Sequence, residues 1–109
     1  MISTVMYGEG TVVSDPELKE LPNSVSTRFN VAVPESRKGK ENNDITYTHY
    51  LTFEAFDTGA KYLVENCRKG DKLVFEAQPR QNRWEDEKTG TKKSRVVFRL
   101  NKFSIIQSD

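Results

Sequence analysis

Three aromatic side chains lie in polar surroundings, and flat rings of this kind can bind other flat groups by stacking. Tyr50 and Phe56 belong to the segment YTHYLTFEAF, residues 47–56, which alternates with the period of two that is typical of a β-strand. Trp84 lies in a stretch that has almost no other apolar residue. An exposed ring needs a partner, which would be a loop, another subunit or a flat ligand such as a nucleobase.

The two faces of residues 47–56 differ in character. One face is predicted to lie in the core and carries Tyr47, His49, Leu51, Phe53 and Ala55. The other face is predicted to meet solvent and carries Thr48, Tyr50, Thr52, Glu54 and Phe56. For one exposed ring alone, burial under a loop or a subunit is the stronger interpretation, so the hypothesis of base stacking depends on the three rings together.

Basic side chains gather in the second half of the chain, where they would supply contacts to phosphates. Through Asp57 there are 5 Lys or Arg against 9 Asp or Glu, and from Thr58 onward 12 against 7, although the net charge is only +1. The candidate phosphate-binding residues are Arg28, Arg80, Arg83, Lys88, Lys92, Lys93, Arg95 and Arg99. Affinity from such contacts falls as salt rises. The alternative for each cation is a solvated side chain, and the acidic residues 85–87 oppose an anionic ligand.

The sequence offers no constellation for catalysis or metal binding. It has neither a P-loop nor a nucleophile elbow, and its one histidine, His49, has no evident catalytic partner. One histidine and one cysteine do not make a zinc site. His49 is therefore predicted to be a structural core residue and Cys67 a small core residue. We expect no enzymatic activity, no metal, no cofactor and no small-molecule substrate.

The composition describes one domain, residues 1–109, with a modest core. Hydrophobic residues make up 35% of the chain and charged residues 30%, and no apolar run approaches the roughly 18 residues of a membrane span. The N-terminal segment MISTVMYGEG lacks the basic and long apolar regions of a secretory signal. A single cysteine suits a reducing compartment. These features predict a cytoplasmic protein that does not enter a membrane.

The first half of the chain is predicted to form three strands. Residues 3–13 form the first, and they contain Gly8 and Gly10, which suit a sharp bend or a close approach of another backbone. Residues 26–33 form the second, which is predicted to end at Pro34 because proline has no donor for the ladder. Residues 35–44 are polar and are predicted to be a mobile loop that leads to the third strand, residues 47–56.

The period of the pattern changes after Phe56. Apolar residues recur at helical spacing at Ala60, Leu63, Val64 and Cys67, which predicts a short helix, with Asp57 or Thr58 as its cap and residues 68–70 at its end. Residues 72–77 form a fourth strand with Leu73, Phe75 and Ala77 inward, and Pro79 then indicates an edge, a bulge or a bend. Residues 80–99 form a long hairpin that turns at residues 88–90, and its polar tip is predicted to project and to be mobile.

This order of elements predicts an all-β fold. Five strands, with one short helix between the third and the fourth and a long protruding hairpin between the fourth and the fifth, follow the order of the OB-fold. That fold is a five-stranded Greek-key barrel that binds oligonucleotides, oligosaccharides or proteins. The order of elements alone does not choose among these ligands.

Several segments in series resemble the bacterial single-stranded DNA-binding protein family, over residues 5–106. They are SDPELKELPN (14–23), FNVAVPES (29–36), THYLTFEAF (48–56), AKYLVENCRKGDKLVFEAQPR (60–80), NRWEDEKTG (82–90) and a closing strand at 96–100. Each segment alone is weak evidence, whereas their order and spacing together are specific.

The resemblance implies roles for particular residues. It implies that Tyr50, Phe56 and Trp84 stack against bases, and that Arg37 stands where some members carry a further stacking tryptophan, a role that a guanidinium plane can also fill. It also implies a homo-oligomer, usually a tetramer and alternatively a dimer, built through first-strand pairing. The residues themselves indicate only that 7–13 present a sheet edge. Because the chain stops at residue 109 without the family's linker and acidic tip, we expect a short form, as in a phage or plasmid version.

We therefore predict an OB-fold that binds single-stranded DNA with little sequence preference, by base stacking and phosphate contacts. It would protect the strand during replication, recombination or repair, in the cytoplasm or nucleoid of a bacterial host. The alternative is a protein-interaction scaffold of the kind that a primosome accessory provides. A weaker alternative is RNA binding, because stacking and charge do not separate RNA from DNA.

Overall fold

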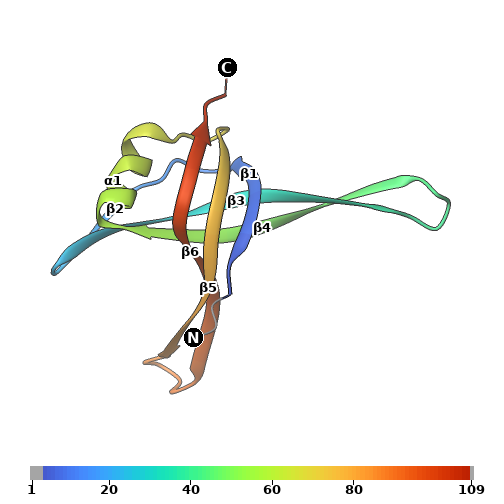
Figure 1. Ribbon diagram of the computed structural model, residues 1–109. Helices are drawn as coiled ribbons and strands as arrows, with labels where there is room; N and C mark the ends of the chain where they lie inside the picture. Colours follow the sequence, from blue (N-terminus) through green and yellow to red (C-terminus); the bar gives the residue numbers. More distant parts are fainter. Residues whose placement is uncertain (1–3, 109) are drawn as a thin grey trace.

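The computed structural model describes residues 4–108, and these residues form a β-barrel with one helix at its end (Figure 1). The elements are β1 (Met6–Val12), β2 (Leu18–Leu21), β3 (Ser24–Lys38), β4 (Asp44–Phe56), α1 (Asp57–Asn66), β5 (Lys72–Glu85) and β6 (Lys92–Ile106). Strands β1, β5, β6, β4 and β3 are neighbours in that order, and a short pairing of β3 with β1 closes the barrel. The predicted five-stranded barrel with a short helix is confirmed. The short strand β2, which pairs with β3, was not predicted.

Four phenylalanine rings form the centre of the core. Phe53 is fully buried, and its ring centroid lies 4.6 Å from that of Phe75, 5.7 Å from that of Phe98 and 6.3 Å from that of Phe29. Leu73, Phe75 and Ala77 point inward, as the alternation of the fourth predicted strand requires. The other fully or nearly buried apolar residues of this cluster are Val12, Val31, Ala55, Leu63 and Cys67.

The closure of the barrel depends on a glycine. A Cβ atom at Gly10 would lie 2.6 Å from the carbonyl oxygen of Ala32 and 2.6 Å from Cγ1 of Val31. These two residues belong to the stretch of β3 that pairs with β1 at Thr11 and Val12. The sequence-based expectation that a glycine of the first strand meets another backbone closely is therefore confirmed at Gly10.

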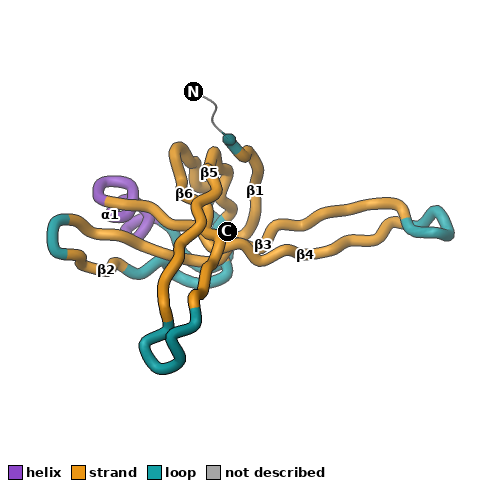
Figure 2. The backbone as a smooth tube through the Cα atoms, turned by 90° about the horizontal axis from the view of Figure 1, so that it is seen from below, coloured by secondary structure: helices purple, strands orange, loops and turns teal. Residues whose placement is uncertain are grey.

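The prediction of a loop at residues 35–44 is wrong. Strand β3 continues through Pro34 to Lys38, and β4 begins at Asp44, so only residues 39–43 form the turn. Pro34 pairs with Thr48 on β4, beyond the two residues at which β3 also meets β1. A proline is tolerated at such an edge because its missing N–H would face away from the ladder. Residues 33–49 therefore extend from the barrel as a two-stranded projection, which we call the β3–β4 arm (Figure 1, Figure 2).

The prediction that Tyr47 and His49 lie in the core is also wrong. Both side chains are exposed because they belong to the β3–β4 arm, where the alternation continues but no barrel lies beneath it. His49 Nε2 lies 2.8 Å from Oε2 of Glu35 on the neighbouring strand. The prediction that this face lies in the core is correct further along β4, where Phe53 and Ala55 are buried.

The second projection matches the predicted hairpin. Residues 80–97, which we call the β5–β6 arm, extend from the barrel in a different direction from the β3–β4 arm (Figure 1, Figure 2). Strand β5 continues through Pro79, where β1 no longer pairs with it, so the proline lies at an edge. A register shift between Glu76 and Ala77 supplies the bulge. Gly90, with φ +70°, lies in the turn.

The helix is placed as predicted, but its cap is not. The capping position is Phe56, whose side chain makes no cap hydrogen bond, and Asp57 instead accepts a 3.4 Å hydrogen bond from the backbone N–H of Val25. At the other end Arg68 Nη1 donates to the carbonyl of Val64 at 2.7 Å. Cys67 is buried, and burial raises the pKa of its thiol to about 11, so it is a core residue as predicted. No helix within residues 4–108 is long and apolar enough to cross a membrane.

One buried carboxylate ties the end of the chain to the barrel. Asp71 accepts hydrogen bonds from the backbone N–H of Ser108 at 3.0 Å, from its hydroxyl at 3.3 Å and from the backbone N–H of Arg68 at 2.9 Å. The bonds from Ser108 and Arg68 hold the pKa of Asp71 below its ordinary value of 3.8. The charged form of Asp71 is thus the form that the folded chain favours.

This arrangement predicts a contribution of Asp71 to acid stability. Because the folded pKa is depressed, the contribution is present above pH 3.8 and is lost as the pH falls through the lower folded value. Asp71→Asn should lower the free energy of unfolding at pH 7, and the difference from wild type should shrink below pH 3.8. Urea unfolding between about pH 2 and 7 measures this. A difference that stays constant over that range would contradict the assignment.

Candidate nucleic-acid interface

Two of the three predicted rings lie on the outer face of the β3–β4 sheet. Tyr50 is opposite Ala32 and Phe56 is opposite Ser26 in the antiparallel ladder, so both rings leave β4 on the side away from the core. Tyr50 is 69% exposed, and its ring is open to a ligand. Phe56 is half-buried, and the guanidinium of Arg99 lies over its ring at 4.8 Å from the centroid. The outer face thus offers one free ring and one ring with a cation already stacked on it.

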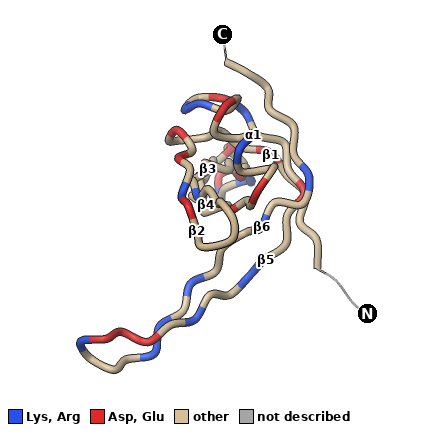
Figure 3. The backbone as a smooth tube through the Cα atoms, turned by 90° about the vertical axis from the view of Figure 1, so that its left-hand side faces the viewer, with Lys and Arg blue, Asp and Glu red and all other residues tan. Residues whose placement is uncertain are grey.

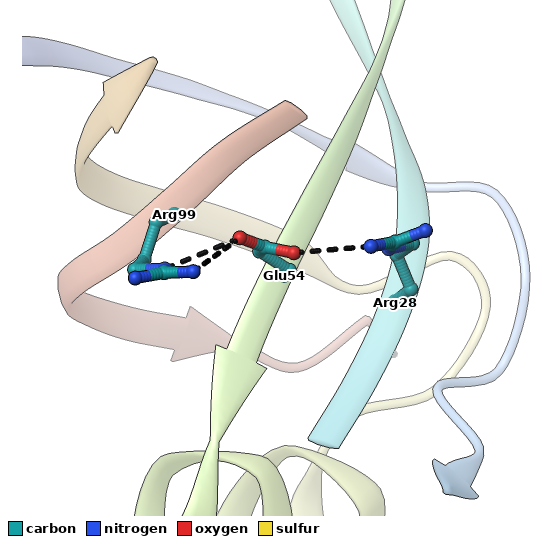
Figure 4. A network of polar contacts seen from close by, with 3 residues as sticks. All are labelled: Arg28, Glu54 and Arg99. Atoms are coloured by element: carbon teal, nitrogen blue, oxygen red, sulfur yellow. Dashed lines mark hydrogen bonds and ion pairs between the residues drawn. The ribbon is translucent and has the colours of Figure 1, made fainter. Parts of the chain in front are cut away.

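A buried carboxylate lies between the two rings. The side chain of Glu54 is only 4% exposed, and it accepts hydrogen bonds from Arg28 on β3 and Arg99 on β6 (Figure 4). Arg28 Nη2 lies 3.3 Å from Oε2, while Arg99 Nη2 and Nε lie 3.0 Å and 3.2 Å from Oε1. We call these three residues the Arg28–Glu54–Arg99 bridge. The prediction that Glu54 meets solvent is wrong, because two arginines from neighbouring strands cover it.

Trp84 lies on the β5–β6 arm, opposite Lys93, and is 47% exposed. Because side chains alternate along a strand, Arg80 and Trp84 lie on the same side of β5. The residues that lie opposite this side on the neighbouring strand are the odd-numbered residues of β6. The aromatic and basic residues of this shared side are therefore Arg80, Trp84, Lys93, Arg95 and Arg99, and the same side also carries Gln78, Asn82 and the fully buried Val97. Arg99 belongs both to this side and to the bridge, so this side of β6 reaches the outer face that carries Phe56 and Tyr50, with the buried Val97 between Arg95 and Arg99.

The other predicted cations of the β5–β6 arm lie close to Trp84 or at the turn. Arg83 and Lys92 alternate with Trp84 and Lys93 along the two strands, and all four line one shallow groove together with Gln81, Glu85 and Ser94. Lys88 is in the turn of that arm, where its backbone N–H donates to Asp86. Lys93 forms a 3.3 Å ion pair with Asp86, which is consistent with the expected opposing effect of the acidic tip. Figure 3 shows basic residues along this arm and acidic residues towards its turn.

Arg37 is not close to the other candidates. It lies near the tip of the β3–β4 arm, where its guanidinium stacks on the ring of Tyr47 at 4.6 Å and donates a 3.1 Å hydrogen bond to the Tyr47 hydroxyl. Tyr47 and Tyr50 are on opposite faces of β4. Arg37 and Tyr47 together form a flat surface at the arm, separate from the outer face that carries Tyr50.

Sequence reasoning assigned no functional role to Glu54, on the outer face, or to Tyr47, on the opposite face of β4. Glu54 was correctly assigned to the outer face, but nothing in the alternation of residues 47–56 shows that Arg28 and Arg99 lie on either side of it. Tyr47 was assigned to the core because its face is buried further along the strand. In both cases the missing information is the pairing of strands that are distant in sequence.

Comparison with known proteins gives one family and one fold. Residues 3–106 match the model of the single-strand binding protein family. A single-stranded DNA-binding protein of Borreliella burgdorferi is 27% identical over 101 residues, which cover 91% of this chain and 66% of that protein. The chain therefore spans slightly less than two thirds of the length of this relative.

Two solved structures have the same fold. The Plasmodium falciparum SSB, solved in complex with single-stranded DNA, matches with a TM-score of 0.82 and 18% identity, over 100% of this chain and 97% of that one. A deletion variant of the single-stranded DNA-binding protein from Thermus aquaticus matches with a TM-score of 0.84 and 19% identity, over 97% of this chain and 51% of that one.

Proposed function

The chain belongs to the single-strand binding protein family, and from this premise we propose that it binds single-stranded DNA with little sequence preference. The family consists of DNA-binding proteins without enzymatic activity. The finer assignment, that the strand is held by base stacking and phosphate contacts and is thereby protected during replication, recombination or repair, is our proposal.

The observation that carries the proposal is the position of Arg99, which lies over Phe56 and on the same side of the β5–β6 ladder as Trp84. Tyr50, Phe56 and Trp84 come from two different hairpins, and Arg99 connects the side of the β5–β6 arm that carries Trp84 with the face that carries the other two rings. Each exposed ring would stack on one base, and stacking is tolerant of sequence because every base has a π-face. Lys93 lies opposite Trp84, Arg95 and Arg80 lie further along the same side of the arm, and all three would contact the phosphates.

The other cations would act beside Trp84 or further along the DNA strand. Arg83 and Lys92 would contact phosphates in the groove that they line together with Trp84, and Lys88 would do so at the turn of the β5–β6 arm. Arg37, stacked on Tyr47, would offer a flat surface to a base at the β3–β4 arm. A strand that contacts both arms would cross the outer face between them, where Tyr50 is exposed.

The test is a titration of Trp84 fluorescence, since Trp84 is the one tryptophan of the chain. Oligo(dT) should quench the emission strongly at low salt and less at high salt, whereas a duplex of equal length should quench it little. Oligo(U) provides the comparison with RNA. If oligo(dT) causes no quenching and no change in the anisotropy of a labelled strand, the protein-interaction scaffold becomes the better assignment.

We also propose that the chain forms a homo-oligomer, a tetramer or a dimer, in the cytoplasm or nucleoid of a bacterial host. Over residues 6–10, strand β1 pairs with β5 on one side and has no partner strand within residues 4–108 on the other. Tyr7, Val74 and Ile106 are exposed apolar residues on the outer side of β1, β5 and β6. A free strand edge beside exposed apolar side chains favours association with a second chain.

A further inference from the structure

The Arg28–Glu54–Arg99 bridge places a negative charge inside the surface that we propose for DNA. Glu54 is the one acidic side chain among the nearly buried groups of the outer face, and both of its carboxylate oxygens accept hydrogen bonds from arginines. The two arginines remain partly open to solvent, with side-chain exposures of 48% for Arg28 and 35% for Arg99. A ligand on this face would therefore meet the guanidinium groups and not the carboxylate.

The position of Glu54 resembles that of a bound phosphate. Guanidinium groups bind carboxylates and phosphates through the same fork of N–H donors, and here the carboxylate already takes up one N–H of Arg28 and two of Arg99. The bridge as a whole carries one positive charge, where two free arginines would carry two. The attraction of this part of the surface for a phosphate is reduced accordingly.

The bridge also fixes the arginine that covers Phe56. Arg99 donates both Nε and Nη2 to Glu54 Oε1, which limits the rotation of its guanidinium plane, and the same plane lies 4.8 Å from the centroid of the Phe56 ring. A guanidinium plane held in this way can stack on a base with its other side. The geometry therefore favours a stacking contact at Arg99 over a phosphate contact.

We propose that Glu54 is an internal counter-anion of the DNA-binding surface. It is a positioning residue that holds Arg28 and Arg99 as flat contact groups and keeps the attraction of this region for phosphates low. This inference rests on the proposed function, because it concerns how the same surface divides its affinity between stacking and charge. It predicts that neutralising Glu54 makes binding tighter at low salt and more dependent on salt.

The experiment measures the affinity of labelled oligo(dT) by anisotropy at several salt concentrations for wild type, Glu54→Gln, Arg28→Gln and the double variant. The slope of log affinity against log salt should become steeper by about 0.7 in Glu54→Gln and shallower by about 0.7 in Arg28→Gln. Between about 50 and 200 mM salt, Glu54→Gln should therefore lose roughly 2.5-fold more affinity than wild type loses. The double variant restores the bridge charge to +1, so its slope should return to the wild-type value.

Three controls separate this role from others. Glu65→Gln changes the total charge equally at an exposed position on α1 and should leave the slope unchanged. A neutral methylphosphonate strand should abolish the gain of Glu54→Gln, because no phosphate charge remains to be attracted. Thermal unfolding identifies a variant that does not fold. If Glu54→Gln does not fold, the salt slopes of Arg28→Gln and the double variant still decide whether Glu54 offsets the charge of Arg28.

The outcomes are distinct. If Glu54→Gln folds and binds with an unchanged or shallower slope, or if the double variant keeps the shallow slope of Arg28→Gln, Arg28 contacts phosphate independently of Glu54 and the inference is wrong. If wild type binds no oligo(dT) at any salt concentration, it is the proposed function that fails.

Discussion

Replacing Trp84 by alanine is expected to weaken the binding of oligo(dT) about 5- to 150-fold. Truncation of an aromatic side chain that stacks on a base costs about 1–3 kcal/mol, and every 1.4 kcal/mol is a factor of ten in the dissociation constant. Trp84 is the largest ring of the proposed surface and extends from a two-stranded arm, where few other groups can replace its contact. Because the variant has no tryptophan, the anisotropy of a labelled strand is the appropriate measurement.

Two comparisons make this result specific. Trp84→Phe keeps a π-face at the same place and should retain most of the affinity that Trp84→Ala loses. Thermal unfolding should be nearly the same for all three proteins, because Trp84 is outside the core cluster. If Trp84→Ala binds oligo(dT) as wild type does, Trp84 does not contribute a stacking contact, and the proposed surface would be restricted to the outer face of β3 and β4.

Replacing Phe53 by alanine is expected to lower the free energy of unfolding by about 3–5 kcal/mol. Phe53 is fully buried and its ring lies against those of Phe29, Phe75 and Phe98, so its removal leaves a cavity between four strands, β3 to β6. Because the stability of a folded domain is about 5–15 kcal/mol in total, a large part of it would be lost. Urea unfolding followed by circular dichroism measures the change.

Tyr50→Ala is the matched control on the same strand. Tyr50 is three residues before Phe53, on the opposite face of β4, and is largely exposed. Its removal should change the free energy of unfolding by no more than about 0.5 kcal/mol. It should weaken the binding of oligo(dT) by about 1–3 kcal/mol. A loss of stability in Tyr50→Ala comparable with that of Phe53→Ala would mean that Tyr50 has a structural role.

The local pattern of the sequence determined which side chains share a face. Alternation with a period of two separated Tyr50 and Phe56 from Phe53 and Ala55, and it placed Leu73, Phe75 and Ala77 in the core. The change to helical spacing after Phe56 located the helix, and the polar composition around Trp84 indicated a projecting arm. These features follow from the chain itself, because the direction of a side chain depends on its own backbone and its immediate neighbours.

The tertiary structure decided how far each face is covered and which groups meet on it. Tyr47 and His49 share the face of Phe53, yet they are exposed because β3 and β4 run on past the end of the barrel. Glu54 is on the outer face, yet it is buried because Arg28, 26 residues before it, and Arg99, 45 residues after it, lie on the neighbouring strands. Strand register and barrel closure join residues that are far apart in the chain, and no local period contains that information.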